Sequence, residues 1–256
     1  TLRLLPWDRD QIHRLFDDLA FRVLRDRLFD TLSAVEPEVD EGFDIRGGAL
    51  EPGTVAAWLA EHASDGRRCG VAVVGTHAVY DGDATALAIA AADGDGAYVD
   101  TSTLTPEDEA ALAAWLADPE QPKALHEAKI AMHDLAGRGW HLAGVTSDTA
   151  LAAYLVRPGQ RSFALDDLSL RYLRRELRAE GPEQQQLSLL DDAEGVDEQA
   201  VQTLILRARA ITDLADALDS ELVRIDSSAL LGEMKLPVQA ALARMETVGI
   251  AVDHDK

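Results

Sequence analysis

The sequence contains very little cysteine and no long apolar run. Its single cysteine, Cys69, excludes an intrachain disulfide framework and a cysteine-rich metal site. No stretch reaches the roughly 18 consecutive apolar residues of a membrane-spanning helix, and no signal-peptide pattern is present. With 47% apolar residues in a chain of 256, one large hydrophobic core or two smaller ones are possible. We therefore expect a soluble, cytoplasmic protein without a membrane partner.

Positive charge is also scarce. The formal net charge at pH 7 is −22, and residues 34–200 carry 12 basic and 31 acidic side chains. Proteins bind nucleic acids mainly through Lys and Arg side chains that release counterions from the phosphates. The one basic cluster, Arg171-Tyr-Leu-Arg-Arg-Glu-Leu-Arg178, is typical of a solvated helix face. The composition therefore predicts weak or no binding of DNA by these residues.

Apolar runs separated by tight turns predict an antiparallel sheet in the middle of the chain. The runs cover residues 70–74, 85–91 and 96–100, and the turns between them are rich in Asp and Gly. Two further short runs, at 123–126 and 145–147, are strand candidates. Helical patterns occur at 53–63, 105–117, 127–138, 148–156, 163–173 and 196–222. This alternation predicts an α/β domain between residues 50 and 230.

Three other segments have different patterns. Residues 8–30 carry apolar side chains at helical spacing, which predicts two short helices or one kinked helix within 1–33. An acidic segment with glycines at 34–49 is typical of a linker. A polar, Gln-rich segment at 179–195 predicts a mobile loop.

A final helix is predicted at 236–248. Pro237 suits its first turn, and Gly249 suits a C-cap before a short Ile-Ala-Val strand. The apolar face comprises Leu236, Ala240, Leu242, Met245 and Val248. An ordinary amphipathic core helix has the same pattern, so this helix alone does not define a function.

Four stretches in a fixed order resemble a known family. They are Gly70-Val-Ala-Val-Val74, Asp148-Thr-Ala-Leu-Ala-Ala-Tyr-Leu155, Leu165-Asp-Asp-Leu-Ser-Leu-Arg-Tyr-Leu173 and the C-terminal Leu-Pro-Val-x-x-x-Leu-x-x-Met-Glu-x-x-Gly-Ile-x-Val-Asp. Over residues 50–256 they resemble the 3′–5′ exonuclease domain of bacterial DNA polymerase I, a family-A polymerase, followed by the start of its polymerase domain. Phe21-Arg-Val-Leu-Arg-Asp-Arg-Leu28 resembles the tail that joins a preceding 5′-nuclease domain.

The resemblance implies a fold and a domain organisation. The implied fold is ribonuclease-H-like, an α/β domain with a mixed sheet and flanking helices, and the predicted order of strands is compatible with it. The implied parts are a helical connector at 1–33, a linker at 34–49, the exonuclease-like domain at 50–230 and the thumb-entry helix of the polymerase domain at 231–256. The apolar face of that last helix is expected to pack on thumb and palm elements beyond Lys256, and to be mobile without them.

The same resemblance implies a metal site that this sequence does not complete. Proofreading in the family uses carboxylates that hold two divalent metals about 4 Å apart. The first motif, Asp-x-Glu at the end of the first strand, falls on Val74 and Thr76. The second motif, Asn-x-x-Tyr-Asp, places Ala131 at its aspartate. The third motif, Tyr-x-x-x-Asp, falls in its best register on Ile205 and Arg209, and an arginine would repel a metal.

The segment is therefore expected to be a vestigial exonuclease, with no catalytic residue, metal ligand or cofactor of its own and no assignable DNA-binding residue. Magnesium is expected only at a polymerase site beyond Lys256. Nearby acids, which we interpret as solvent-exposed or capping residues, are Asp81, Asp83, Asp134, Asp213 and Asp216.

Other candidate sites lack partners. The histidines His126, His133, His77 and His141 have no cysteine or carboxylate set that would complete a zinc site. The nucleophile candidates Ser64, Ser102 and Cys69 have no adjacent base in a strand–turn–helix context. The tryptophans Trp58, Trp115 and Trp140 lie on apolar faces without basic neighbours, which predicts core anchors rather than base-stacking platforms.

Three functions remain open. In the first, the chain is part of a DNA polymerase I, a monomer that performs DNA-directed synthesis in replication and repair and contacts DNA through its other parts. In the second, it is an active metal-dependent 3′–5′ exonuclease, which requires carboxylates that the motifs do not supply. In the third, it is a non-enzymatic interaction module on the same fold. The length of the gene separates the first function from the third.

Overall fold

The computed structural model describes residues 15–16, 46–79, 82–177 and 198–249. Nearly all of the predicted connector at 1–33, most of the predicted linker, the predicted loop at 179–195 and the strand predicted after Gly249 lie outside these residues.

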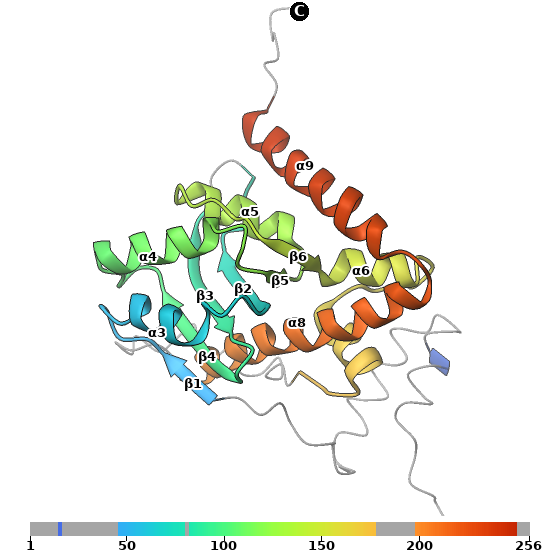
Figure 1. Ribbon diagram of the computed structural model, residues 1–256, viewed down its shortest axis with the longest axis horizontal. Helices are drawn as coiled ribbons and strands as arrows, with labels where there is room; N and C mark the ends of the chain where they lie inside the picture. The colour runs from blue at the N-terminus through green and yellow to red at the C-terminus, as the bar shows by residue number, and fades with distance from the viewer. Residues whose placement is uncertain (1–14, 17–45, 80–81, 178–197, 250–256) are drawn as a thin grey trace, which may run out of the picture.

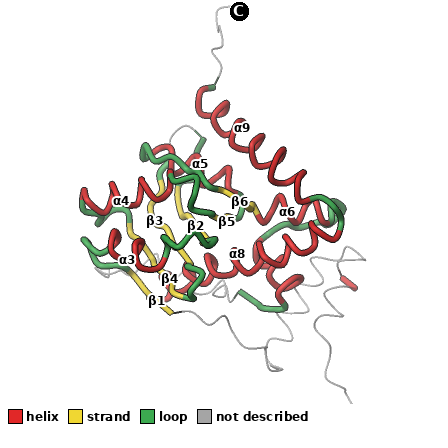
Figure 2. The backbone as a smooth tube through the Cα atoms, viewed as in Figure 1, coloured by secondary structure: helices red, strands yellow, loops and turns green. Residues whose placement is uncertain are grey.

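The described residues form a six-stranded sheet in the order β1-β4-β3-β2-β5-β6. The strands β2 (Cys69–Gly75), β3 (Ala84–Ala90) and β4 (Asp95–Asp100) make the predicted antiparallel meander. Beyond it, β5 (Lys123–Leu125) pairs in parallel with β2, and β6 (Val145–Asp148) pairs in parallel with β5. Figure 2 shows the strands as a central layer between helices. The predicted mixed sheet with flanking helices is confirmed.

The edge strand β1 (Arg46–Ala49) lies at the end of the segment predicted as a linker at 34–49. Residues 46–49 are part of the sheet, where they pair in parallel with β4. Gly47 has a φ of 114°, and a Cβ atom there would lie 1.7 Å from the carbonyl oxygen of Gly96. Glycine at this position therefore permits a close approach of two strands. Composition does not distinguish such a glycine from one in a flexible linker.

Two hydrophobic cores lie on the two faces of the sheet, because side chains alternate along a strand. One face, with Leu87 and Ile89, packs against α3 (Val55–His62), α4 (Pro106–Ala117) and α5 (Ala128–Gly137). The other face, with Ala86 and Ala88, packs against α8 (Glu198–Arg224). The three tryptophans predicted as core anchors, Trp58, Trp115 and Trp140, are all buried.

Helix starts follow local signals. Thr105 caps α4 by accepting the backbone N–H of Asp108, and Pro106 occupies the first turn. Asp148 caps α6 (Thr149–Val156) in the same way. The helix predicted at 163–173 consists of α7 (Leu165–Leu168) and a π-helical turn, η1 (Ser169–Leu173). The residues that set these ends are adjacent in sequence, which is why the sequence pattern located them.

The C-terminal helices extend along the outside of the domain. After α8 come η2 (Leu230–Lys235) and α9 (Leu236–Val248), which ends at Gly249 with a φ of 66°. In Figure 1, α9 lies over α5, and it also contacts the end of β6. None of the helices described here is long and apolar enough to cross a membrane.

Candidate functional site

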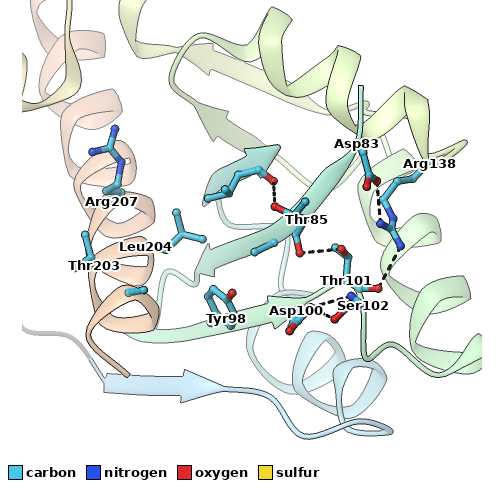
Figure 3. Close-up of a pocket in the computed structure, with 13 residues that line it drawn as sticks. Asp83, Thr85, Tyr98, Asp100, Thr101, Ser102, Arg138, Thr203, Leu204 and Arg207 are labelled. Atoms are coloured by element: carbon cyan, nitrogen blue, oxygen red, sulfur yellow. Dashed lines mark hydrogen bonds and ion pairs between the residues drawn. The ribbon is translucent and has the colours of Figure 1, made fainter. Parts of the chain in front are cut away.

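A cavity of about 700 Å³ lies between α8 and the end of the meander where the first motif falls. Figure 3 shows Thr203, Leu204 and Arg207 of α8 on one side, and Tyr98, Thr85 and Asp100 of the sheet on the other. Val74, at the end of β2, also lines this cavity. It is the place where the resemblance puts the metal site.

The first motif position is occupied by an apolar side chain. Val74 is 42% exposed, which is unusual for a valine at the end of a buried strand, and its branched side chain offers no ligand. Thr76 lies just beyond β2 and closes the turn to β3. Its N–H donates to the carbonyl of Asp83, and its hydroxyl accepts the N–H of Asp83, both at 3.0 Å. Neither position supplies a carboxylate.

The second motif position is part of the hydrophobic core. Ala131 lies on α5, is 6% exposed and belongs to the same cluster as Leu135 and Leu125. Its methyl group fills space between α5 and the sheet. A metal ligand at this position is therefore missing as well.

Neither residue assigned to the third motif lines the cavity. Ile205 is buried against Gly96, where a Cβ atom would lie 2.5 Å from the Ile205 Cγ2. Arg209 forms an ion pair with Asp213 at 3.1 Å. The α8 residues at the cavity are instead Ala200, Thr203, Leu204 and Arg207. A one-residue change rotates a helical position by about 100°, so a small error in register selects the wrong face.

A register shifted by one residue leads to the same chemical conclusion. It places the motif on Leu204, at the cavity, and on Ala208, which is fully buried. No carboxylate appears in either register. The signal that could have located this face is the apolar spacing along α8, since Leu204, Ala208 and Ile211 are all buried.

The two carboxylates that do line the cavity are engaged by neighbouring donors. Arg138 Nη1 donates to Asp83 Oδ1 at 2.9 Å. The backbone N–H and the hydroxyl of Ser102 donate to Asp100 Oδ1 at 2.8 and 2.6 Å. Arg138 and Arg207 also line the cavity, so it contains both acidic and basic side chains rather than an acidic cluster.

One of the acids interpreted as exposed or capping is deeply buried. Asp134 is fully buried and accepts hydrogen bonds from the N–H and the Nδ1 of His77, at 2.8 and 2.9 Å. Asp134 lies three residues after Ala131 on α5, so both side chains face the sheet. Because aspartate is usually exposed, the sequence did not indicate that Asp134 is buried. Asp213 pairs with Arg175 and Arg209, and Asp216 pairs with Arg68. Asp81 lies outside the described residues.

The other candidate groups have separate neighbours. His126 Nδ1 lies 2.8 Å from the Thr149 hydroxyl, whereas His133 Nε2 lies 2.8 Å from a carboxylate oxygen of Glu246. Burial lowers the pKa of His126 to about 4, which keeps its ring neutral. Burial also raises the pKa of Cys69 to about 11, so it is a poor nucleophile. The Ser64 hydroxyl donates to the carbonyl of Ala60.

These residues do not fit a pair of divalent metals. Such a site needs several oxygen ligands, and the positions available offer valine, threonine and alanine. Across residues 46–79, 82–177 and 198–249, no group of three His, Cys, Asp or Glu side chains is placed to hold a metal ion. We therefore derive no metal-dependent step at this cavity.

The sheet order, with α8 across one face and a cavity at the strand ends, defines a ribonuclease-H-like domain of the exonuclease type. A family model described as "DNA polymerase I, ribonuclease H-like domain" matches residues 78–180. RNase D from Trypanosoma brucei shares the fold, with a TM-score of 0.62 at 15% identity over 83% of this chain and 76% of that one.

Closer similarity is to polymerases. DNA polymerase I of Mycobacterium tuberculosis strain H37Rv is 78% identical over 254 residues, which cover 99% of this chain and 28% of that protein. The polymerase domain of Pol1 from M. smegmatis, solved in complex with DNA primer-template and dNTP, is 71% identical with a TM-score of 0.70, covering 80% of this chain and 32% of that one. The chain belongs to the bacterial DNA polymerase I family.

Proposed function

We propose that this chain is the part of a DNA polymerase I that carries a catalytically inactive exonuclease-like domain and the first polymerase helix. The observation that carries the proposal is the set of residues at three motif positions: Val74 at the cavity, Thr76 just beyond β2 and Ala131 in the core. Without carboxylates at these three positions, the family's motifs do not supply the ligands for two divalent ions that would activate water and stabilise a leaving oxygen. The chain spans 28% of the length of its relative from M. tuberculosis, so the activity of the whole protein is part of this proposal.

The intact protein, in this proposal, is a monomeric, cytoplasmic, DNA-directed DNA polymerase that acts in replication and repair. Its exonuclease-like domain extends from β1 to about residue 230, and residues 231–256 form the entry to the thumb. Residues 1–33 connect to a preceding 5′-nuclease domain. DNA binds to other parts of the protein, which agrees with the net charge of −22 on this chain, and magnesium binds at the polymerase site.

The first test is a nuclease assay. The purified chain, incubated with a 3′-labelled single strand and magnesium or manganese, should not shorten the strand. The cavity acids Asp83→Asn and Asp100→Asn are the informative variants, and Asp216→Asn is the control because Asp216 lies on α8 paired with Arg68. Metal-dependent shortening that the cavity variants abolish and the control retains would establish the active exonuclease instead.

A further inference from the structure

Two polar side chains of α9 make hydrogen bonds to the domain beneath it. The Gln239 Nε2 donates to Asp148 Oδ2 at 2.6 Å. About two turns further on, the Glu246 carboxylate contacts two residues of α5. It accepts a hydrogen bond from Lys129 Nζ at 2.7 Å and lies 2.8 Å from His133 Nε2. Gln239 and Glu246 are seven residues apart, so they share one side of the helix. Two polar contacts thus hold the two ends of α9.

The Asp148 carboxylate accepts hydrogen bonds from three helices, α6, α5 and α9. It is fully buried, and its Oδ1 accepts the N–H of Ala150 at 3.0 Å at the start of α6. Its Oδ2 accepts the N–H of Ala128 at 2.8 Å at the start of α5, in addition to the bond from Gln239. A carboxylate only accepts hydrogen bonds, so the Gln239 amide must present its NH₂ group here.

The second contact is charge-assisted. Hydrogen bonds from Lys129 and then from His133 hold the pKa of Glu246 below its usual range. Lys129 and Glu246 are partly exposed, while the His133 side chain is buried. Hydrogen bonds to charged groups are shorter and more directional than apolar contacts, so they fix a rotation as well as a separation.

Apolar packing between α9 and the domain is incomplete. A cavity of about 540 Å³ lies between them, lined by Trp140 and Leu142 on one side and by Ala240 and Val248 on the other. The apolar side chains Leu236 and Ala243 of α9 are buried, whereas Val238 and Met245 are exposed at 49% and 66%. Only part of the apolar surface of α9 therefore packs on the domain, and the polar contacts add to it.

We propose that Asp148 and Glu246, through Gln239, Lys129 and His133, form a polar latch that fixes the orientation of α9 on the exonuclease-like domain. The inactive domain then acts as a rigid mount for the helix that leads into the polymerase. This rests on the proposed function above. Asp148 and Glu246 are positioning residues, because they act on DNA only through the helix that they hold.

The direct test is hydrogen exchange on the chain with Gln239→Ala and Glu246→Ala combined. Amides of α9 should exchange about ten-fold faster or more than in the parent chain, whereas β2 and β3 amides should not change. The control is Arg244→Ala, which truncates an exposed side chain of the same helix outside both contacts. Unchanged exchange in α9 of the double variant would overturn the latch.

A second variant separates the latch from a general loss of packing. Gln239→Glu has almost the same shape but places a carboxylate against buried Asp148. At neutral pH, α9 should exchange faster, and protection should return as the pH falls and one carboxylate binds a proton. A pH-independent effect would mean that the contact acts by shape alone and would contradict the latch.

In the intact polymerase, loosening the mount should affect the grip on DNA more than the chemistry. The double variant should raise the KM for primer-template several-fold with little change in kcat, and Arg244→Ala should do neither. An unchanged KM would show that the latch does not position the polymerase. Nuclease activity of the parent protein, or an intact protein without polymerase activity, would instead contradict the proposed function, so the two failures are distinguishable.

Discussion

At the scale of single residues, three side chains are the basis of the proposed inactivity. Val74, Thr76 and Ala131 stand where an exonuclease of this family needs carboxylates. Two of them have a role in the fold: Thr76 closes a turn and Ala131 fills the core. In the proposed inactive domain, these two positions therefore serve the fold rather than a metal site.

A second feature at the scale of single residues is a buried lysine. Lys123 is fully buried, and its Nζ donates to the carbonyls of Asp118 and Gln121 and lies 4.7 Å from the Trp115 ring. Burial lowers the pKa of Lys123 to about 8, because the charged form loses its hydration. The unfolded chain, with an ordinary lysine pKa, then binds more protons than the folded protein above about pH 8.

This difference predicts a pH-dependent stability. The free energy of unfolding should rise as the pH increases from about 7.5 to 9, since the unfolded state binds more protons in that window. Above it the raised pKa of Cys69 acts in the opposite direction. Urea unfolding across this range should show the rise in the parent chain and not in Lys123→Met. The control Lys235→Met should show the same rise as the parent chain. If Lys123→Met also shows the rise, burial of Lys123 is not the cause of the pH dependence.

At the scale of elements, the close packing of α8 on the sheet depends on small residues in the strands that it covers. Ala86, Ala88 and Ala90 face the helix, and a Cβ atom on Gly70 would lie 2.1 Å from the Ala208 carbonyl oxygen. The backbone cannot yield there without moving α8 or β2. The close contact between α8 and the sheet therefore requires a residue without a side chain at position 70.

A matched pair of glycines tests this contact. Gly70→Ala should lower the free energy of unfolding by about 1–3 kcal/mol or more, because a methyl group would overlap the helix backbone. Gly48→Ala, where a Cβ atom meets nothing within 4 Å, should change it by about 0.5 kcal/mol or less. Chemical unfolding of both variants is the measurement. Equal effects would show that the close approach of α8 does not limit residue 70.

At the scale of the whole molecule, the net negative charge disfavours contact with DNA. The net charge is −22, and in the basic cluster at 171–178 the charge of Arg175 is partly neutralised by an ion pair with Asp213. A surface of this kind repels phosphates over most of its area. In the proposed polymerase, contact with DNA falls to other parts of the protein.

The corresponding prediction concerns affinity. The isolated chain should bind short duplex or single-stranded DNA with a Kd of about 10⁻⁴ M or weaker at physiological salt, as fluorescence anisotropy would measure. Micromolar binding with a steep salt dependence would contradict this. The source of such binding would be identified by replacing Arg171, Arg174, Arg175 and Arg178 with Ala.

The sequence by itself determined the features that depend on neighbouring residues. The meander from β2 to β4 follows from apolar runs and tight turns, and the start of α4 follows from Thr105 and Pro106. The absence of carboxylates at Val74 and Ala131 follows from residue identity and order alone.

Only the tertiary structure decided the features that depend on residues far apart in the chain. The pairing of residues 46–49 with β4, the burial of Asp134 and the rotation of α8 that brings Arg207 to the cavity are such features. The contact between Asp148 and Gln239 joins residues 91 positions apart. A local pattern specifies which face of a helix is apolar, but the partner that covers a face, and the polar groups that hold it there, are set by packing.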